Sequence, residues 1–322
     1  MVDVTEARPL DARASDGEGP DHPDHMIPSR VSLSPTQEVS KRPSPLTRVR
    51  HLWQYRELLG NLIRKELKVK YKNSVLGFVW SLLNPLMYLV VFSFVFGAVL
   101  QVKVPYYGIF FLSGLLAWNF FSSGVMGGTS CIVMNAQLVT KVWFPREALV
   151  LASVGAALVH FFLQSLVLFG ALLVFTRAPD ASFLPALLLA MVVLLVLTSA
   201  LGIALSAINV YLRDTQHLLE VVLLAWFWFS AIAYPYAGVI KALKYHVPGG
   251  AAEWIATANP VLLIVITFQK MIYNPAKDVA LIDHNQGWYL GHLGIALAVS
   301  VAVLYGALVI FSHLEDNFAE EI

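Results

Sequence analysis

The stretch LVTKVWFPREALVLA, residues 138–152, separates two long runs without charged residues. One run ends at Thr140 and the next begins at Ala148. Between them stand a lysine, a tryptophan, a proline, an arginine and a glutamate. This junction is therefore a short charged segment between two long runs that carry no charge.

Composition identifies the solvent in which the chain folds. Of its 322 residues, 57% are hydrophobic and 13% are charged, whereas soluble domains carry about 25% charged residues. This balance predicts a polytopic membrane protein. Because Cys131 is the single cysteine, an internal disulfide is excluded. It lies in an apolar run, and we interpret it as a small packing residue.

Six charge-free runs exceed the ~20 residues needed to cross a bilayer. They cover 73–102, 104–140, 148–176, 181–212, 221–240 and 284–314. Within a transmembrane domain at 73–314, we place the spans at about 75–100, 107–132, 148–176, 183–209, 218–236 and 288–312. The predicted fold is therefore an all-α integral membrane protein with six transmembrane helices.

Basic residues predict the orientation. Thirteen of the 22 Lys and Arg residues precede the first span, so the positive-inside rule places the N-terminus in the cytoplasm. Six spans return the C-terminus, residues 315–322, to the same side. The junction at 141–147 then faces the cytoplasm, and the segment 237–283 faces outward.

The chain before the first span has two predicted parts. Residues 1–46 are rich in Asp, Pro, Gly and Ser without a hydrophobic period, which predicts a disordered cytoplasmic tail. Residues 47–72 place apolar side chains at helical spacing among many Lys and Arg residues. This pattern predicts an amphipathic helix in the membrane interface.

Missing features exclude several functions. The predicted spans contain one charged residue, Glu220, near the start of the fifth, which argues against an ion-coupled carrier that needs carboxylates within the membrane. The sequence has no catalytic motif, no metal-binding cluster and no nucleotide-binding loop. We therefore expect no enzyme activity and no cofactor in this chain, and any driving force must arrive through the cytoplasmic loops.

The opening stretch can receive such a force. Asn135 can cap a short helix, Pro145 ends it, and Glu147 suits the N-terminus of the next helix. A compact and partly apolar element of this kind fits the docking of a soluble partner. An ordinary interfacial turn with an aromatic anchor explains the pattern equally well.

Four motifs resemble one family. They are KVKYKNSVLGFVWSLLNPLMYLVVFSFVFG (68–97), KVWFPREALVLA (141–152), AINVYLRDTQHLLE (207–220) and NFAEEI (317–322). Together they resemble the permease subunit of ABC-2 type polysaccharide exporters of the Wzm/TagG kind, from about residue 50 to the C-terminus. The ending FSHLEDNFAEEI with the acidic N-terminal tail is most similar to the galactan exporters of mycobacteria and corynebacteria.

The resemblance implies a partner and an energy source. Such permeases are homodimers in the bacterial inner membrane and pair with two copies of a separate ATPase subunit, which binds ATP and Mg²⁺. Residues 136–147 would be the coupling helix that docks into the ATPase. Its coupling residues would be Leu138, Val139, Lys141, Trp143, Phe144, Pro145, Arg146 and Glu147.

The resemblance also implies an outer gate. Two short helices within 237–283 would form it, and Asn259-Pro260 is a suitable cap and first position for one of them. We assign Tyr236, Asn259, Pro260 and Phe268 to this gate. The chain departs from the family pattern at WFWFSAIAYPY (226–236), which keeps only Pro235, and at Gln269, where relatives often have arginine.

An exported glycan is wide, polar and mostly neutral. Its path should offer hydroxyls, amides and aromatic faces, because sugar rings stack on aromatic side chains. From the aromatic clusters we choose Tyr88, Trp118, Trp226 and Tyr234 as channel-lining residues, although aromatic side chains also gather at lipid interfaces. We interpret Gly124, Gly127 and Gly128 as a surface for close helix packing.

These observations predict a permease subunit that exports a lipid-linked polysaccharide, such as galactan or an O-antigen-like glycan. Two alternatives remain. The first is a small-molecule exporter of the same superfamily, and the second is a membrane enzyme of glycan synthesis.

Overall fold

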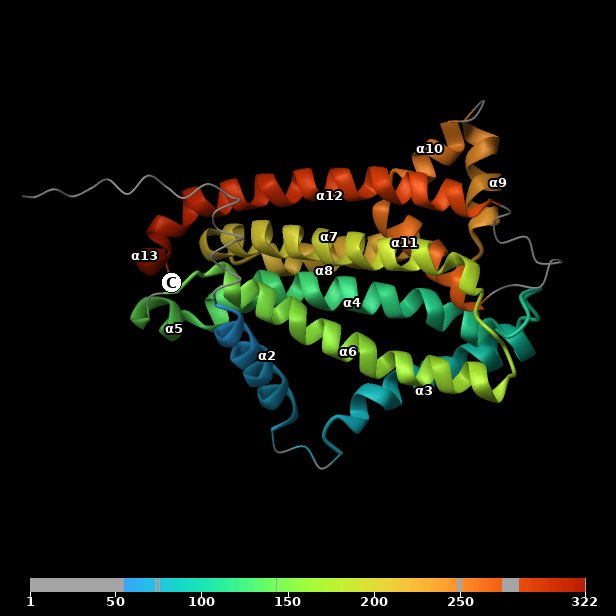
Figure 1. Cartoon of the computed structure of the whole chain (residues 1–322), viewed down its shortest axis with the longest axis horizontal. Helices are drawn as coiled ribbons and strands as arrows, with labels where there is room; N and C mark the ends of the chain where they lie inside the picture. The colour runs from blue at the N-terminus through green and yellow to red at the C-terminus, as the bar shows by residue number, and fades with distance from the viewer. Residues whose placement is uncertain are drawn as a thin grey trace, which may run out of the picture. The chain divides into compact units, whose positions relative to one another are not determined.

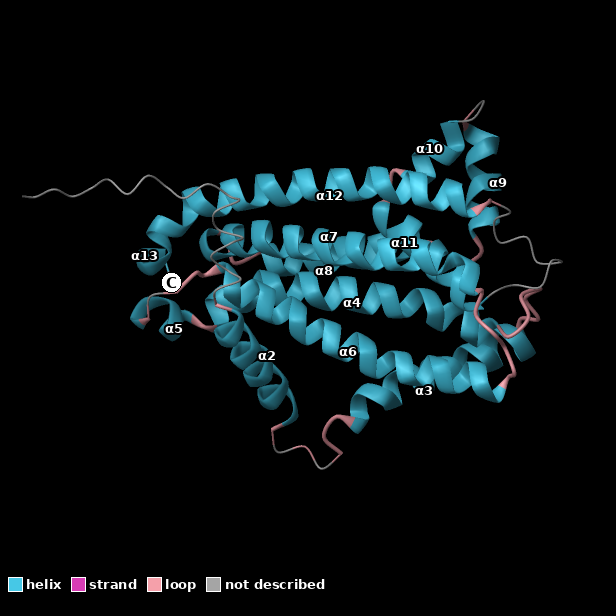
Figure 2. Ribbon diagram, viewed as in Figure 1, coloured by secondary structure: helices cyan, strands magenta, loops and turns pink. Residues whose placement is uncertain are grey.

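The computed structural model describes residues 55–72, 74, 76–142, 144–247, 251–273 and 284–321, without the side chains of residues 319 and 320. All of them belong to one compact unit, residues 42–322. Every regular element in these ranges is a helix, which confirms the predicted all-α class (Figure 2). The predicted tail, the first residues of the interface helix and parts of the gate segment lie outside the described residues.

Five helices are long and apolar enough to cross a membrane. They are α3 with its π-helical end η1 (Val79–Phe92, Ser93–Val99), α4 (Tyr107–Met134), α6 (Glu147–Val174), η2 with α7 (Ala181–Phe183, Leu184–Tyr211), and α12 (Gln286–Leu314). After α12 come the short helices η4 (Glu315–Asn317) and α13 (Phe318–Glu321). The predicted spans at 75–100, 107–132, 148–176, 183–209 and 288–312 each fall on one of these long helices, which run alongside one another in Figure 1.

The predicted span at 218–236 falls on a shorter element. Helix α8 (Thr215–Phe229) has 15 residues, about 22 Å at 1.5 Å per residue, less than the ~30 Å hydrocarbon core. The chain then turns, with Ala231 at a φ of 52°, before α9 (Tyr236–His246) begins. A membrane-embedded α8 would therefore place the turn that follows it, residues 230–235, at membrane depth.

A second interruption follows. Helix α10 (Ala251–Thr257) and the combined segment α11 (Pro260–Phe268) and η3 (Gln269–Tyr273) meet at an angle of 88°. Counting this bent pair as one span raises the number of candidate spans to six. Helices α9 and α10 form a protrusion at one end of the bundle, called here the α9 end, and α5 (Ala136–Lys141) lies at the opposite α5 end (Figure 1).

Helix α4 is the centre of the packing. In the apolar stretch of α4, 78% of the residues are buried, compared with 6% in the apolar stretch of α3 and η1. It packs on α6, α7 and α11. A Cβ atom added to Gly124 would lie 2.6 Å from Thr198 Cγ2, and one added to Gly128 would lie 3.1 Å from Gly202 Cα. The predicted role of this glycine cluster in close packing is confirmed.

The interface helix packs on the bundle through one face. Helix α2 (Arg56–Tyr71) buries Leu62 and lies against α6. A Cβ atom at Gly155 of α6 would lie 2.6 Å from Ile63 Cδ1, so the missing side chain lets the two helices approach. The basic residues Lys65, Lys68 and Lys70 remain exposed.

Candidate functional site

The predicted coupling helix, residues 136–147, is helical only over α5, Ala136–Lys141, because the chain becomes extended at Val142. The expected side-chain cap at Asn135 is not formed. Helix α5 buries Val139, which is 4% exposed. The Lys65 ammonium of α2 donates a hydrogen bond to Asn135 Oδ1 at 2.7 Å, and the Asn135 amide donates to the Cys131 carbonyl at 2.8 Å. These contacts tie the start of α5 to α2 and to the end of α4.

Beside α5 lies an open hollow of about 650 Å³. Its lining combines polar and apolar side chains from α2, the end of α4 and α5: Lys65, Met134, Asn135, Ala136, Gln137, Leu138, Lys141 and Val142. Met134 and Val142 are strongly exposed. Exposed apolar side chains gathered around a hollow are typical of a docking surface.

The other predicted coupling residues are distributed between surface and interior. Lys141 is exposed, and Leu138, Phe144, Pro145 and Arg146 are half-buried. Glu147 is 3% exposed and lies in the first turn of α6, where a carboxylate is favourable to the helix. Trp143 lies outside the described residues. The coupling role of these residues stays a prediction.

The residues after α5 contact the C-terminal segment. The Arg146 guanidinium donates a hydrogen bond to the Glu315 carbonyl and lies 5.5 Å from the centre of the Phe318 ring. The Tyr211 hydroxyl, at the end of α7, donates to the Leu314 carbonyl at 2.8 Å. We call Arg146, Tyr211, Leu314, Glu315 and Phe318 the C-terminal clamp.

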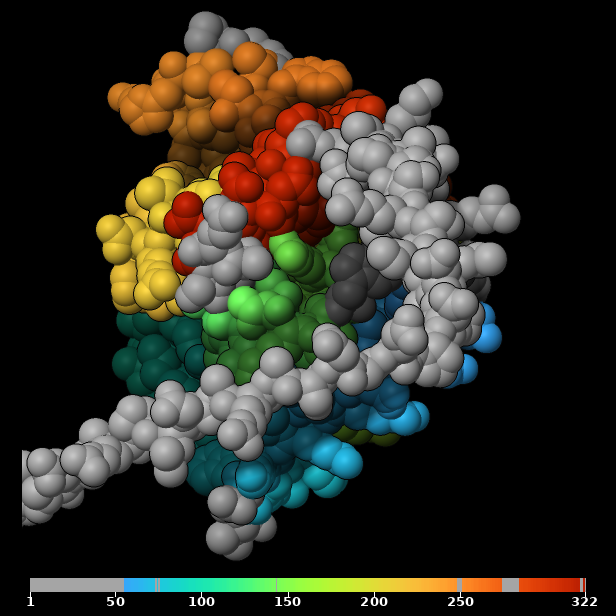
Figure 3. Space-filling view, turned by 90° about the vertical axis from the view of Figure 1, so that its left-hand side faces the viewer, coloured from blue at the N-terminus to red at the C-terminus, as the bar shows by residue number. Residues whose placement is uncertain are grey.

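The C-terminal clamp joins segments that are distant in the sequence. Three of the four motifs identified above, at 141–152, 207–220 and 317–322, contribute to it. Figure 3 looks onto the α5 end, where residues of the C-terminal segment, in red, lie directly against residues of the α5–α6 region, in green. The Leu314 carbonyl at the end of α12 thereby gains a partner in the Tyr211 hydroxyl.

A polar groove runs along the transmembrane part of the bundle. It has a volume of about 550 Å³. Its lining comes from five helices and consists of Lys70 and Tyr71 (α2), Trp80, Ser81, Asn84 and Tyr88 (α3), Asn119, Ser122, Ser123 and Met126 (α4), His160 and Gln164 (α6), and Glu220 and Leu223 (α8). Most of these groups are neutral and can form hydrogen bonds.

Hydrogen bonds hold the groove together. The Tyr71 hydroxyl interacts with Ser81 Oγ, and both oxygens lie near His160 Nδ1, at 3.1 Å and 3.2 Å. This cluster connects the end of α2 to α3 and α6. The Asn119 amide donates to Gln164 Oε1 at 3.4 Å. Desolvation lowers the pKa of Lys70 at the α2 side of the groove.

Sequence reasoning missed most of this groove because it searched the spans for charges. A signal was present in the spacing of neutral polar residues. Asn119, Ser122 and Ser123 form one stripe of α4, Ser81 and Asn84 one stripe of α3. Such a pattern shows that each helix has a polar face, but the pattern on one helix does not show which other faces it meets.

The four predicted channel-lining residues lie in different surroundings. Tyr88 is 43% exposed and lines the polar groove. Trp118 is 7% exposed and packs between Phe121 and Phe227 in the protein core. Only Tyr88 of the four lines the groove, so a stacking role for the others stays a prediction that this arrangement does not support.

The other two predicted channel-lining residues form hydrogen bonds near the end of α8. The Trp226 indole donates to Asn259 Oδ1 at 2.9 Å. The Tyr234 hydroxyl donates to the Trp228 carbonyl, and both Trp226 and Tyr234 are half-buried.

Of the predicted gate residues, Asn259 bonds to the end of α8 and Tyr236 begins α9 directly after the break at residues 230–235. Asn259 Oδ1 accepts from the Val261 and Leu262 backbone amides at 3.1 Å and 3.3 Å, while its amide donates to the Phe229 carbonyl at 3.1 Å. Pro260 occupies the first turn of α11. Tyr236 and Phe268 are buried. The cap expected at Asn259-Pro260 is confirmed.

Gln269, where the chain departs from the family pattern, also stabilises the backbone of the break at residues 230–235. The buried Gln269 side chain donates to the Ala231 carbonyl at 3.3 Å and also approaches the Ile232 carbonyl at 3.5 Å. The Tyr107 hydroxyl donates to the Ala233 carbonyl. Backbone carbonyls within a bilayer need internal partners, and side chains from α4, α11 and η3 supply them here.

Asn259→Ala should therefore lower the stability of the α9 end. The substitution removes a helix cap and leaves the Trp226 indole and the Phe229 carbonyl without this partner. We expect a loss of about 1–3 kcal/mol in the free energy of unfolding, measured by thermal unfolding of the purified protein. Asn285→Ala, which removes the exposed cap of α12, is the control and should have a smaller effect. Equal effects of the two substitutions would contradict the role of Asn259 in joining α8 to the start of α11.

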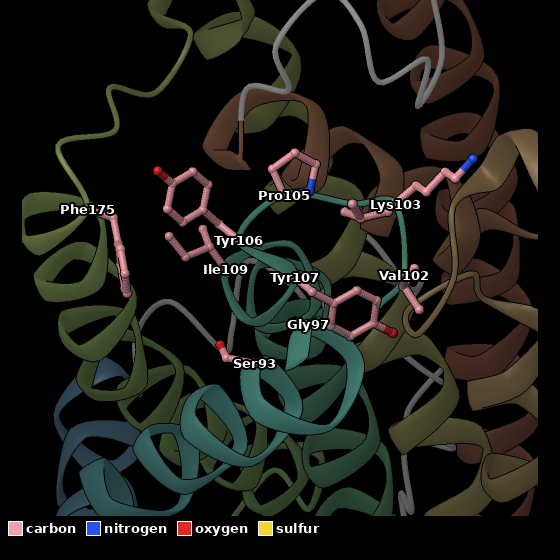
Figure 4. Close-up of a pocket in the computed structure, with 10 residues that line it drawn as sticks. Ser93, Gly97, Val102, Lys103, Pro105, Tyr106, Tyr107, Ile109 and Phe175 are labelled. Atoms are coloured by element: carbon pink, nitrogen blue, oxygen red, sulfur yellow. The ribbon is translucent and has the colours of Figure 1, made fainter. Parts of the chain in front are cut away.

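A second cavity lies near the α9 end (Figure 4). It has a volume of about 550 Å³, and carbon atoms form most of its lining: Ser93, Gly97, Val102, Lys103, Val104, Pro105, Tyr106, Tyr107, Ile109 and Phe175. In Figure 4 the Lys103 ammonium points away from the cavity. This cavity offers a sugar few hydrogen-bonding partners, so the polar groove is the better candidate for a glycan path.

Comparison with known proteins gives a consistent result. The chain matches the model of the ABC-2 type transporter family over residues 57–273. It is 32% identical over 276 residues to the O-antigen export system permease protein RfbA of Myxococcus xanthus, covering 85% of this chain and 98% of that protein. Two proteins of the same name from Klebsiella pneumoniae are 27% and 28% identical, each covering 82% of this chain and 94% of its own length.

Proposed function

The chain belongs to the ABC-2 type transporter family, and from this premise we propose that it exports a lipid-linked polysaccharide across the bacterial inner membrane. The cargo is a galactan or an O-antigen-like glycan. The chain is the permease subunit, and a separate ATPase subunit that binds ATP and Mg²⁺ drives it. Both termini and the α5 end face the cytoplasm.

The polar groove is the observation that carries this proposal. A membrane transporter for ions or charged solutes keeps charged groups along its path, whereas this groove offers hydroxyls, amides, an imidazole and the rings of Trp80 and Tyr88. The acidic and basic side chains of its lining are Lys70, His160 and Glu220. Neutral hydrogen-bonding groups combined with aromatic faces match the chemistry of sugars.

The open side of the groove supports a homodimer. Helices α3 and α8, which line the groove, expose much of their apolar surface within the described chain. Two copies that face each other across these helices would enclose a path from two half-grooves. Each copy would dock one ATPase subunit at α5 and the hollow beside it.

Depletion of the protein in its native host tests the function. We expect lipid-linked glycan to accumulate in the inner leaflet of the inner membrane and to disappear from the cell surface. The composition of the accumulated glycan would identify the cargo. Continued surface glycan with no accumulation would favour the small-molecule exporter instead, and loss of glycan synthesis itself would favour an enzyme.

A further inference from the structure

The C-terminal clamp connects the predicted coupling junction to two long helices. Arg146 lies directly before α6, and its partners Glu315 and Phe318 follow α12. Tyr211, the last residue of α7, contacts both the Leu314 carbonyl and the Phe318 ring. A displacement of the junction therefore acts on the ends of α7 and α12 together.

Phe318 is the centre of the C-terminal clamp. Its side chain is 0% exposed. Its ring makes edge contacts with Tyr211 and Phe311, at centroid distances of 6.2 Å and 5.4 Å, and carries the Arg146 guanidinium over its face. These contacts fix the ring between the ends of α7 and α12.

The alternative connection from α5 is weaker. Lys65 and Asn135 form a single exposed hydrogen bond between α2 and the start of α5. An exposed lysine contact competes with water and contributes little. The C-terminal clamp combines a buried ring, a cation over its face and two hydrogen bonds to helix-end carbonyls, so it is firmer than the contact between Lys65 and Asn135.

From the C-terminal clamp a chain of close contacts leads to the groove. Helix α12 packs along α7, and α7 meets α4 where a Cβ atom at Gly128 would lie 3.1 Å from Gly202 Cα. Helix α4 carries Asn119, Ser122 and Ser123 of the groove lining. Tightly packed helices move as units because the packing leaves no space to absorb a displacement.

We propose that the C-terminal clamp transmits the movement of the docked ATPase from residues 144–147 to α7 and α12, with Phe318 as its positioning residue. This inference rests on the proposed function, because it assumes an ATPase that docks at α5. Leu314, Glu315 and Phe318 thereby take part in coupling ATP hydrolysis to transport.

Phe318→Leu tests the inference in the full complex. The substitution keeps a large apolar side chain and removes the aromatic ring that Arg146 and Tyr211 contact. In proteoliposomes containing the permease, its ATPase and lipid-linked glycan, we expect unchanged partner binding and ATP hydrolysis. The number of glycans translocated per ATP should fall by about threefold or more, in the range seen for altered coupling. Phe169→Leu, the same exchange at an exposed position of α6, is the control and should leave the ratio unchanged.

Two results would overturn the inference. One is a folded Phe318→Leu complex with the wild-type ratio of transport to hydrolysis. The other is loss of the ATPase from that complex, because the C-terminal segment would then belong to the docking surface. If Phe318→Leu does not accumulate, Tyr211→Phe decides the question, since it keeps the ring and removes the hydroxyl that donates to the Leu314 carbonyl. It too should lower the ratio, and a wild-type ratio would refute the proposal.

A second readout separates this inference from the proposed function. Spin labels at Thr140 and Tyr305, both exposed, report the separation of α5 and α12 without any glycan. Because the C-terminal clamp moves α12 together with the junction, trapping ATP should leave this distance unchanged in the otherwise wild-type chain and should change it with Phe318→Leu. The same response in both chains would refute the inference. A complex that hydrolyses ATP and shows this difference between the two chains but moves no glycan would refute the proposed cargo alone.

Discussion

Ser123→Trp is expected to lower glycan export by about tenfold or more, which corresponds to a barrier raised by about 1.4 kcal/mol, while the protein stays folded. Ser123 is an exposed residue of α4 that lines the polar groove. Its hydroxyl donates to the Asn119 carbonyl of its own helix at 2.5 Å, so no contact between helices depends on it. An indole at this position would project into the space proposed for the glycan.

Export is measured as surface glycan in cells that carry only the variant, and folding as the elution of the purified protein in size-exclusion chromatography. Ser123→Ala is the matched control, since it removes the hydroxyl without filling the groove and should leave export unchanged. Wild-type export by a folded Ser123→Trp variant would show that the glycan takes another path.

Gly128→Leu is expected to abolish the accumulation of folded protein. A Cβ atom at Gly128 would lie 3.1 Å from the Gly202 backbone and 3.2 Å from Val150 Cγ1. The remaining atoms of leucine would push α4 away from α7 and α6 at the centre of the bundle. Overpacking by small groups already costs about 1–3 kcal/mol, and a whole side chain between helices exceeds that, compared with a total stability of about 5–15 kcal/mol for typical proteins.

The amount of folded protein extracted from membranes and its thermal unfolding temperature check this prediction. Gly170→Leu is the control, because a Cβ atom at Gly170 meets nothing within 4 Å. This substitution should be tolerated. Equal accumulation of both variants would mean that α4 and α7 can separate without loss of the fold.

Local signals were sufficient for much of the fold. The long charge-free runs predicted the helices α3, α4, α6, α7 and α12, because a bilayer requires a continuous apolar helix of a given length. Asn259-Pro260 predicted the start of α11, since a side-chain cap and a proline act within one turn. The length of α8 was not predictable in this way, because the apolar run continues past the break at residues 230–235.

The candidate site depended on contacts between distant residues. Aromatic content alone could not separate Tyr88, which lines the polar groove, from Trp118, which lies in the core. The partners of Arg146 are 169 residues away or more, and no pattern near Arg146 indicates them.

By itself the sequence determined the solvent, the positions of five long helices and the place of the charged junction, because hydropathy and capping act over a few residues. The tertiary structure decided that neutral polar stripes of α3, α4 and α6 meet in one groove and that the C-terminal segment holds the junction after α5. These features arise from the rotation of each helix about its own axis. Packing sets that rotation, as where Gly128 lets α4 approach α7, and side chains on several helices together determine it.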